Sequence, residues 1–93
     1  MKYLTIVRLA PGVDNARRSF EVFQKVGLPP GTESSWAAAD GRTFITVTES
    51  DGPPDMANTI TFAPYLEETQ VIPMVPLDDA WIKAVEAAQA NWT

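Results

Sequence analysis

Cysteine and histidine are both absent from this chain of 93 residues. The lack of cysteine excludes disulfides, thiolate metal sites and cysteine nucleophiles. The lack of histidine removes the usual general base, the proximal haem ligand and the usual non-thiolate zinc ligand. We therefore expect neither a cofactor nor a bound metal. We also expect one domain, residues 1–93, that is short of core when it stands alone.

The charge and hydropathy of the chain restrict its partners. The net charge is −5 and the isoelectric point is near 4.4, which disfavours binding to a nucleic-acid backbone or an anionic membrane. No apolar run approaches the ~20 residues that a spanning helix needs. The first residues, 1–8, contain no uninterrupted apolar stretch of the signal-peptide type. We expect a cytoplasmic protein that binds neither nucleic acid nor membrane.

The first half of the chain predicts a strand, a helix and a hairpin. Residues 2–9 are rich in β-branched and apolar types, as in a strand. Asp14 can cap a helix that reaches Val26, with Gly27 as the left-handed residue after it. Residues 32–39 and 43–49 read as two strands, and the turn signal at residues 40–42 joins them.

The second half predicts a helix, a strand and a last helix. The prolines at 53 and 54 lead into a helix that Pro64 closes, although residues 59–62 also have strand propensity. Residues 67–75 read as a strand, and Pro73 and Pro76, which cannot donate ladder hydrogen bonds, confine it to a sheet edge. Asp78 is the expected cap of a C-terminal helix, about 78–92. The order is βαββαβ plus a helix, an α+β ferredoxin-like fold in which two helices cover one face of an antiparallel four-stranded sheet.

Sorting alternate strand residues divides the sheet into two faces. One set is small or aliphatic and is assigned to the helix-covered face: Leu4, Ile6, Ala37, Ala39, Ile45, Val47, Val71 and Val75. The other is aromatic and apolar with interspersed hydroxyls, and is assigned to the open face: Tyr3, Thr5, Val7, Ser34, Trp36, Ala38, Phe44, Thr46, Thr48, Gln70, Ile72 and Met74. An open face of this kind is too apolar to leave in water. We expect a homodimer through the sheet face, with a cavity between the two sheets.

Short motifs resemble a known superfamily. They are the opening Met-Lys-Tyr-Leu, Pro29-Pro30-Gly31 ahead of Trp36, Phe44 with Glu49 and Asp51, and the run Val71-Ile72-Pro73-Met74-Val75. Together with the order of elements, these resemble the dimeric α/β-barrel superfamily, and most closely its small single-domain members of unknown function. The resemblance implies the fold and the dimer. It also admits several activities, among them cofactor-free monooxygenases, polyketide cyclases and isomerases.

The open-face residues are also the candidate ligand-binding residues. The expected ligand is a small, largely apolar or aromatic molecule, and the alternative is a cofactor-independent monooxygenase, isomerase or cyclase acting on an aromatic or polyketide-like substrate. Trp36 either stacks on a flat ligand or fills the dimer interface. The other candidates could hydrogen-bond or pack against such a ligand: Tyr3, Thr5, Phe44, Thr46, Gln70 and Met74.

Several other residues have a functional and a structural interpretation. Arg8 could anchor a carboxylate, but pairing with a nearby acid is the commoner role for a strand-end arginine. Glu49 and Asp51 could form an acid–base pair, although exposed turn acids are commoner. Asn58 could be a catalytic amide or a solvated helix residue. Trp81 and Trp92 are expected to dock on the sheet domain or on a partner subunit. No single residue identifies a reaction.

Overall fold

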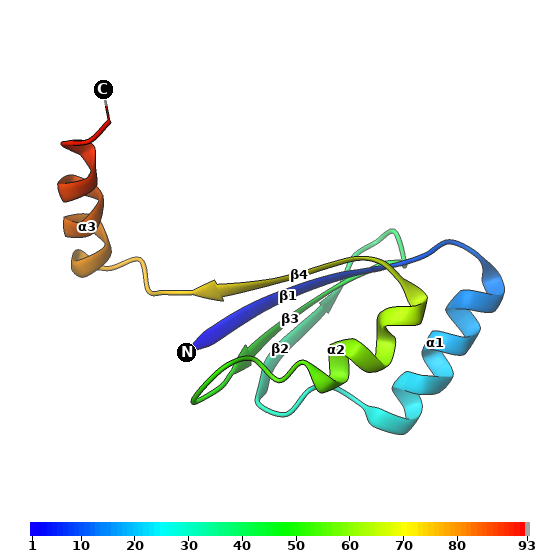
Figure 1. Ribbon diagram of the computed structural model, residues 1–93. Helices are drawn as coiled ribbons and strands as arrows, with labels where there is room; N and C mark the ends of the chain where they lie inside the picture. The colour runs from blue at the N-terminus through cyan, green and yellow to red at the C-terminus, as the bar shows by residue number, and fades with distance from the viewer. Residues whose placement is uncertain (93) are drawn as a thin grey trace.

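The computed structural model describes residues 1–92 and confirms the expected order of elements (Figure 1). The elements are β1 (Lys2–Leu9), α1 (Val13–Val26), β2 (Thr32–Ala37), β3 (Thr43–Glu49), α2 (Ala57–Phe62), the 3₁₀ turn η1 (Ala63–Tyr65), β4 (Leu66–Met74) and α3 (Asp79–Gln89). The four strands form one antiparallel sheet in the order β2-β3-β1-β4. Helices α1 and α2 lie on one side of this sheet (Figure 1).

The ends of α1 differ in part from expectation. Gly12, with φ of 120°, occupies the N-cap position and offers no side-chain acceptor, while Asp14 lies inside the first turn. A carboxylate there still interacts favourably with the positive end of the helix. At the other end Gly27 has φ of 68° and donates its N–H to Phe23 O, as expected for a left-handed residue after a helix.

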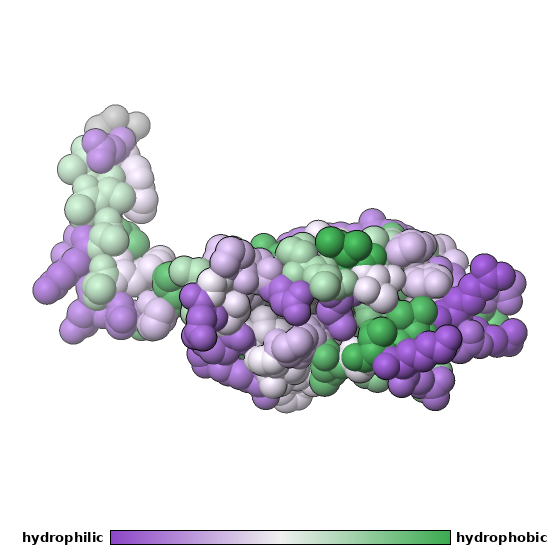
Figure 2. Space-filling view, turned by 60° about the horizontal axis from the view of Figure 1, so that its bottom comes forward, coloured by the Kyte–Doolittle hydropathy of each residue, from purple (hydrophilic) through white to green (hydrophobic). Residues whose placement is uncertain are grey.

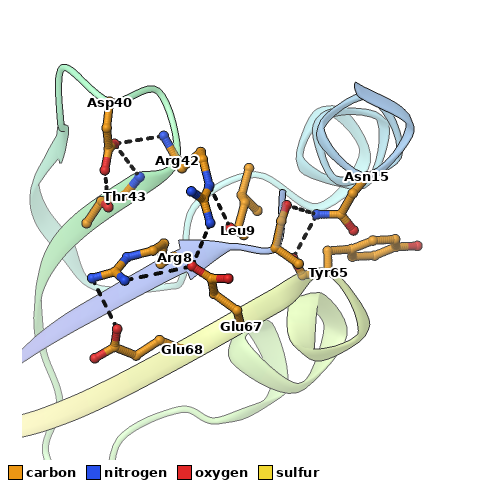
Figure 3. A network of polar contacts seen from close by, with 10 residues as sticks. Arg8, Leu9, Asn15, Asp40, Arg42, Thr43, Tyr65, Glu67 and Glu68 are labelled. Atoms are coloured by element: carbon orange, nitrogen blue, oxygen red, sulfur yellow. Dashed lines mark hydrogen bonds and ion pairs between the residues drawn. The ribbon is translucent and has the colours of Figure 1, made fainter. Parts of the chain in front are cut away.

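The turn between β2 and β3 is organised by Asp40. Its carboxylate accepts hydrogen bonds from Arg42 N at 2.8 Å, Thr43 N at 2.9 Å and Thr43 Oγ1 at 2.8 Å (Figure 3). These donors, first of all the backbone N–H of Arg42, hold the pKa of Asp40 below its ordinary value of 3.8. The carboxylate thereby fixes the hairpin register from one side of the turn.

Asp40→Asn is expected to reduce stability at neutral pH and to matter less in acid. Because the pKa of Asp40 is lower in the folded chain, the charged form stabilises the fold above pH 3.8, and this contribution is lost as the pH falls through the folded value. The measurement is the difference in free energy of unfolding between wild type and variant at pH 7 and at pH 3. A difference that stays constant between these pH values contradicts the role of the charge.

The second half of the sheet domain follows the expected plan with shifted boundaries. Helix α2 is short, and Pro64 lies inside the 3₁₀ turn that follows it, where a missing N–H costs little. Strand β4 is an edge strand, and Pro73 pairs opposite Tyr3 of β1. Strand β2, the other edge, ends at Ala37 and is therefore shorter than expected. Asp78 caps α3 as expected, because its carboxylate accepts the Trp81 N–H at 3.1 Å.

The register corrects the expected face assignment for β1 and β3. A cavity lies between the sheet and the helices α1 and α2, and Thr5 and Val7 of β1 line it. These two residues pair directly opposite Thr46 and Phe44 of β3. Residues directly opposite each other in an antiparallel pair point to the same face. Four residues expected on the open face therefore lie on the helix-covered face, namely Thr5, Val7, Phe44 and Thr46. Tyr3 and Thr48, which continue the same alternation, share that face with them.

The open face carries the aliphatic set of β1 and β3 instead. Leu4 pairs with Val47, and Ile6 pairs with Ile45. Trp36, Gln70 and Ile72 pair with members of this set, so the assignment of β2 and β4 was correct. The error arose because both alternate sets of β1 are largely apolar, and polarity alone does not say which one meets the helices.

Helix α3 stands apart from the sheet domain, by which we mean the elements from β1 to β4. The extensive contacts between elements join the strands to one another and join α1, α2 and η1; within residues 1–92, α3 takes part in none of them. Figure 1 shows α3 beyond the end of β4, on the side of the sheet away from α1 and α2. The radius of gyration is 16.6 Å, against about 12 Å for a compact domain of this length.

The core of a single chain is small. Among residues 1–92 only Tyr3, Leu9 and Ser19 are buried, and Tyr3 is 8% exposed. The remaining strand residues are half-buried or exposed. The helix-covered face and the open face of the sheet therefore both keep apolar surface in contact with solvent.

Candidate functional site

A cavity of about 400 Å³ lies between the sheet and the helices α1 and α2. All four phenylalanines of the chain line it: Phe20, Phe23, Phe44 and Phe62. They come from α1, β3 and α2, three elements that are distant in sequence. A volume in this range and an aromatic lining are features that small-molecule sites commonly have.

The sheet forms one wall of the cavity and supplies hydroxyl groups. Val7 and Phe44 pair directly opposite each other, next to the Thr5–Thr46 pair. Ser35 of β2 pairs opposite Thr46 and extends this polar row toward the sheet edge. The wall thus combines an apolar part with a row of hydroxyls, which can orient a ligand that carries an oxygen.

The helices form the other wall and leave aromatic surface in contact with solvent. Phe20 is 59% exposed and Phe23 is 41% exposed, although both line the cavity. Ser19 of the same helix also lines the cavity and is buried, and its hydroxyl donates to Ala16 O at 2.9 Å. An occupant of the cavity would remove part of the phenylalanine surface from water.

Asn58 fixes α2 relative to the chain that leaves α1. Its Nδ2 donates to Gly27 O at 3.2 Å, and both residues line the cavity. With this amide hydrogen committed, the side-chain oxygen and the second N–H of Asn58 remain available for other partners. The expectation of a merely solvated helix residue was therefore incomplete, because Asn58 is half-buried and joins α2 to the residue that follows α1.

A network of polar contacts joins the start of α1, the 3₁₀ turn η1 and the neighbouring strand ends (Figure 3). Asn15 Nδ2 donates to Ala10 O at 2.8 Å and to Tyr65 O at 2.9 Å, which ties the start of α1 to the 3₁₀ turn. Arg42 donates to Leu9 O at 3.1 Å and to Glu67 Oε1 at 2.6 Å. The Asn15 contacts hold the start of α1 beside η1, and the Arg42 contacts join the turn before β3 to β1 and β4.

The structure brings some of the predicted site residues together and separates others. Thr5, Phe44 and Thr46 line the cavity. Tyr3 lies on the same face, but its hydroxyl donates to Gly52 O at 3.0 Å. Gln70 is exposed on the open face and donates to Glu68 Oε1 at 2.8 Å. Trp36, 67% exposed, and the half-buried Met74 also belong to the open face.

The charged candidates take part in surface ion pairs. Arg8 lies 3.2 Å from Glu68 and 3.8 Å from Glu67, which confirms the expectation of a strand-end arginine paired with acids. Glu49 accepts from the N-terminal ammonium at 2.8 Å and borders a smaller hollow of about 190 Å³ beside the main cavity. Asp51 is exposed in the following turn.

Residues 1–92 contain neither a cluster suited to a metal ion nor a helix suited to span a membrane. In residues 1–92 no three acidic, histidine or cysteine side chains gather as a metal site requires. No helix in that range has both the length and the apolar character needed to cross a membrane.

The residues that sequence reasoning missed come mainly from the helices. Phe20 and Phe23 recur at helical spacing, a pattern that core and ligand-lining residues share, so the spacing alone does not mark them as site residues. Phe62 lay in the stretch with mixed propensity. The available signal was positional: three of the four phenylalanines, Phe20, Phe23 and Phe62, fall on segments predicted to cover the sheet.

Comparison with known proteins gives a family and a fold. A crystal structure of hypothetical protein PHS023 from Pyrococcus horikoshii is 17% identical and superposes with a TM-score of 0.50 over 83% of this chain and 94% of that one. This likeness shows the α+β fold alone. No curated protein matches the sequence. The family model described as a domain of unknown function, DUF3303, matches residues 1–89, and the chain therefore belongs to the DUF3303 family.

Proposed function

We propose that the protein binds a small, largely apolar or aromatic molecule in the cavity between the sheet and the helices. The observation that carries the proposal is the convergence of all four phenylalanines on one cavity of about 400 Å³. Cavities of roughly 300–1,000 Å³ with aromatic walls and few polar groups are typical of small-molecule sites. The ligand class we propose is the one expected from the sequence, but the location we propose for it is the helix-covered face and not the space between two sheets.

The lining also favours a ligand with an oxygen on one edge. Thr5, Thr46 and Ser35 place hydroxyls on the sheet wall, and Asn58 places an amide on the helix wall. A flat ring between these walls would contact phenylalanine faces, and its oxygen would reach the hydroxyl row. Hydroxyls, an amide and aromatic rings are groups suited to binding and orienting such a molecule.

The test uses 1-naphthol, a flat aromatic probe with one hydroxyl, and two variants of β2. Ser35→Trp should weaken binding at least about 10-fold, because Ser35 lines the cavity and an indole there occupies ligand space. Ser34→Trp is the matched control, since the neighbouring residue pairs with Val47 and points to the open face. Isothermal titration or probe fluorescence measures both affinities.

Two results contradict the proposal. One is a wild-type protein that does not bind 1-naphthol at millimolar concentration. The other is equal loss of affinity in Ser35→Trp and Ser34→Trp, which would place the probe elsewhere or reflect a general disturbance of β2. Circular dichroism of both variants shows whether the sheet is intact.

We also propose that the chain forms a homodimer through the open face of the sheet. Leu4, Ile6, Ile45 and Val47 occupy the centre of this face and are only half-buried in one chain. Burying such side chains contributes roughly 1.5–3 kcal/mol each when burial is complete. The small core of a single chain supports the same proposal. The mass of the full chain in solution tests it.

A further inference from the structure

We propose that α3 is an exchanged arm, which packs its apolar side across the open sheet face of a second copy of this chain. This inference rests on the proposed homodimer and assigns α3 its place in it. Each copy would give its α3 to the other, so the contact would be two-fold symmetric and closed. Three features of the chain lead to this assignment: the side chains of α3, the connector before it, and the distribution of charge on the open face.

Helix α3 carries an apolar stripe that the other elements of residues 1–92 do not cover through any extensive contact. Trp81, Val85, Ala88 and Trp92 follow one another at spacings of three and four residues, and so share one side of the helix and its continuation. Trp81 is 44% exposed and Trp92 is 63% exposed. In Figure 2 the arm with α3 stands clear of the body of the molecule and shows hydrophobic surface, in pale green, along it.

The charged residues of α3 lie away from this stripe. Asp79, Lys83 and Glu86 project from the opposite side of the helix, judged by the 100° rotation per residue. They would stay in water when the stripe is covered. A helix with one apolar and one charged side is the form expected for docking on a surface, not for an independent arm in solvent.

The connector holds α3 away from its own sheet. Residues 75–78 join β4 to α3, and Pro73 and Pro76 restrict the backbone on either side of Val75. Val75 is 61% exposed and Leu77 is 77% exposed, so the connector itself carries uncovered apolar side chains. The arm rises on the side of the sheet that α1 and α2 leave free (Figure 1). A second copy stacked on that side would meet it.

The open face has the charge distribution of an interface. Its central positions are the aliphatic pairs of β1 and β3, Leu4–Val47 and Ile6–Ile45. Its charged residues lie at the strand ends, where Lys2 pairs with Glu33 at 2.8 Å and Arg8 pairs with Glu68 at 3.2 Å. An apolar centre with a charged rim is the usual anatomy of a protein–protein interface.

The dimensions of helix and face also agree. The 11 residues of α3 span about 16 Å at 1.5 Å per residue. Four strands spaced about 4.8 Å apart give a face of about 15–19 Å across the sheet. The apolar area exposed on the open face, the connector and the stripe is on the order of 800 Å² per chain, which is what a standard dimer interface buries.

The experiment combines light scattering with paired glutamate substitutions in α3. Wild type should have twice the 10.2 kDa mass of one chain at micromolar concentration. Val85→Glu puts a charge in the apolar stripe and should weaken the dimer at least about 30-fold. Ala87→Glu adds the same charge on the other side of the same helix and should change the dissociation constant less than about 3-fold. Neither change affects residues of the sheet domain.

A second variant identifies the surface that α3 contacts. The chain has no cysteine, so a Val85→Cys, Ile45→Cys double variant contains a single pair of thiols per chain. After mild oxidation, peptide mapping should show a disulfide between positions 85 and 45 in a covalent dimer. Trp36→Glu puts a charge on the open face and should weaken the dimer as Val85→Glu does. Because Trp36 is 67% exposed in one chain, this change should leave the fold of that chain intact.

Each outcome decides between the two proposals. A monomeric wild type overturns both the homodimer and the exchange. A dimer that Trp36→Glu weakens but Val85→Glu does not keeps the homodimer and overturns the exchange. A link between positions 85 and 45 within one chain shows that α3 folds back on its own sheet, which also overturns the exchange.

Discussion

Gly31→Ala is expected to lower the free energy of unfolding by about 3 kcal/mol, the sum of a backbone cost and a steric one. Gly31 has φ of 78°, a conformation that costs an L-residue roughly 1–2 kcal/mol. A Cβ at this position would also meet the backbone carbonyl oxygen of Glu49 closer than atoms approach. The contact cannot relax easily, because Glu49 N donates to Gly31 O at 3.0 Å and fixes the two backbones together.

Gly41→Ala is the matched control for this effect. Gly41 has φ of 72°, nearly that of Gly31, but an added Cβ there meets nothing within 4 Å. Only the conformational cost remains, so we expect a loss of roughly 1–2 kcal/mol. Urea denaturation of the two variants measures the difference. Equal losses in both would show that the backbone around Glu49 shifts to accommodate the methyl group.

Position 31 also matters for the candidate site. Leu28 and Pro29 line the cavity, and Gly31 lies where this segment turns into β2. Gly31 and Glu49 both line the smaller hollow beside the cavity, so their close approach lies next to the part of the site that Leu28 and Pro29 form. The motif Pro29-Pro30-Gly31 could be recognised in the sequence as a helix stop, but the contact that makes the glycine necessary is with a strand 18 residues later.

The order of elements could be predicted because its signals are local. Gly27 after α1, Asp40 in the hairpin turn and Asp78 before α3 each act on neighbours within a few residues. Their positions in the structure agree with this local chemistry. The start of α1 is the exception to this agreement. Gly12 and not Asp14 is the N-cap, so the helix begins two residues earlier than expected and has no capping side chain.

The face of each strand could not be predicted because it depends on partners. In β1 the alternate sets are Leu4 and Ile6 against Tyr3 and Val7, both apolar. The choice is made by the register with β3 and by the position of α1, whose phenylalanines line the same cavity as Val7 and Phe44. In β4 the neighbouring Glu68 and Gln70 mark the open face more clearly, and there the assignment was correct.

The chemical character of the candidate site could be predicted from the sequence better than the location of the site in the fold. Thr5, Phe44 and Thr46 were selected as an apolar surface with hydroxyls, and they do line one cavity. Their partners, Phe20, Phe23 and Asn58, come from helices whose contact with the sheet no local pattern specifies. The position of α3 is a further example, since its stripe indicates packing without indicating the surface that it packs on.

Tyr3→Ala is expected to cost about 3–5 kcal/mol of stability, comparable to other buried aromatic truncations. Tyr3 is 8% exposed and is the largest of the side chains that a single chain buries among residues 1–92. Its ring lies on the helix-covered face of β1, and its hydroxyl donates to Gly52 O at 3.0 Å, in the turn before α2. Truncation removes the packing and releases the turn together.

Tyr3→Phe separates the two contributions and tests whether Tyr3 also serves the ligand. The ring stays and only the hydrogen bond to Gly52 is lost, so the expected cost is about 1 kcal/mol. Because the hydroxyl is already committed to Gly52 O and Tyr3 is absent from the cavity lining, the affinity for 1-naphthol should change less than about 2-fold. Thr46→Val is the contrasting variant, since it removes a hydroxyl that lines the cavity at nearly constant volume. If Tyr3→Phe weakens 1-naphthol binding more than Thr46→Val does, the ligand contacts the Tyr3 hydroxyl and the binding site extends toward the turn at Gly52.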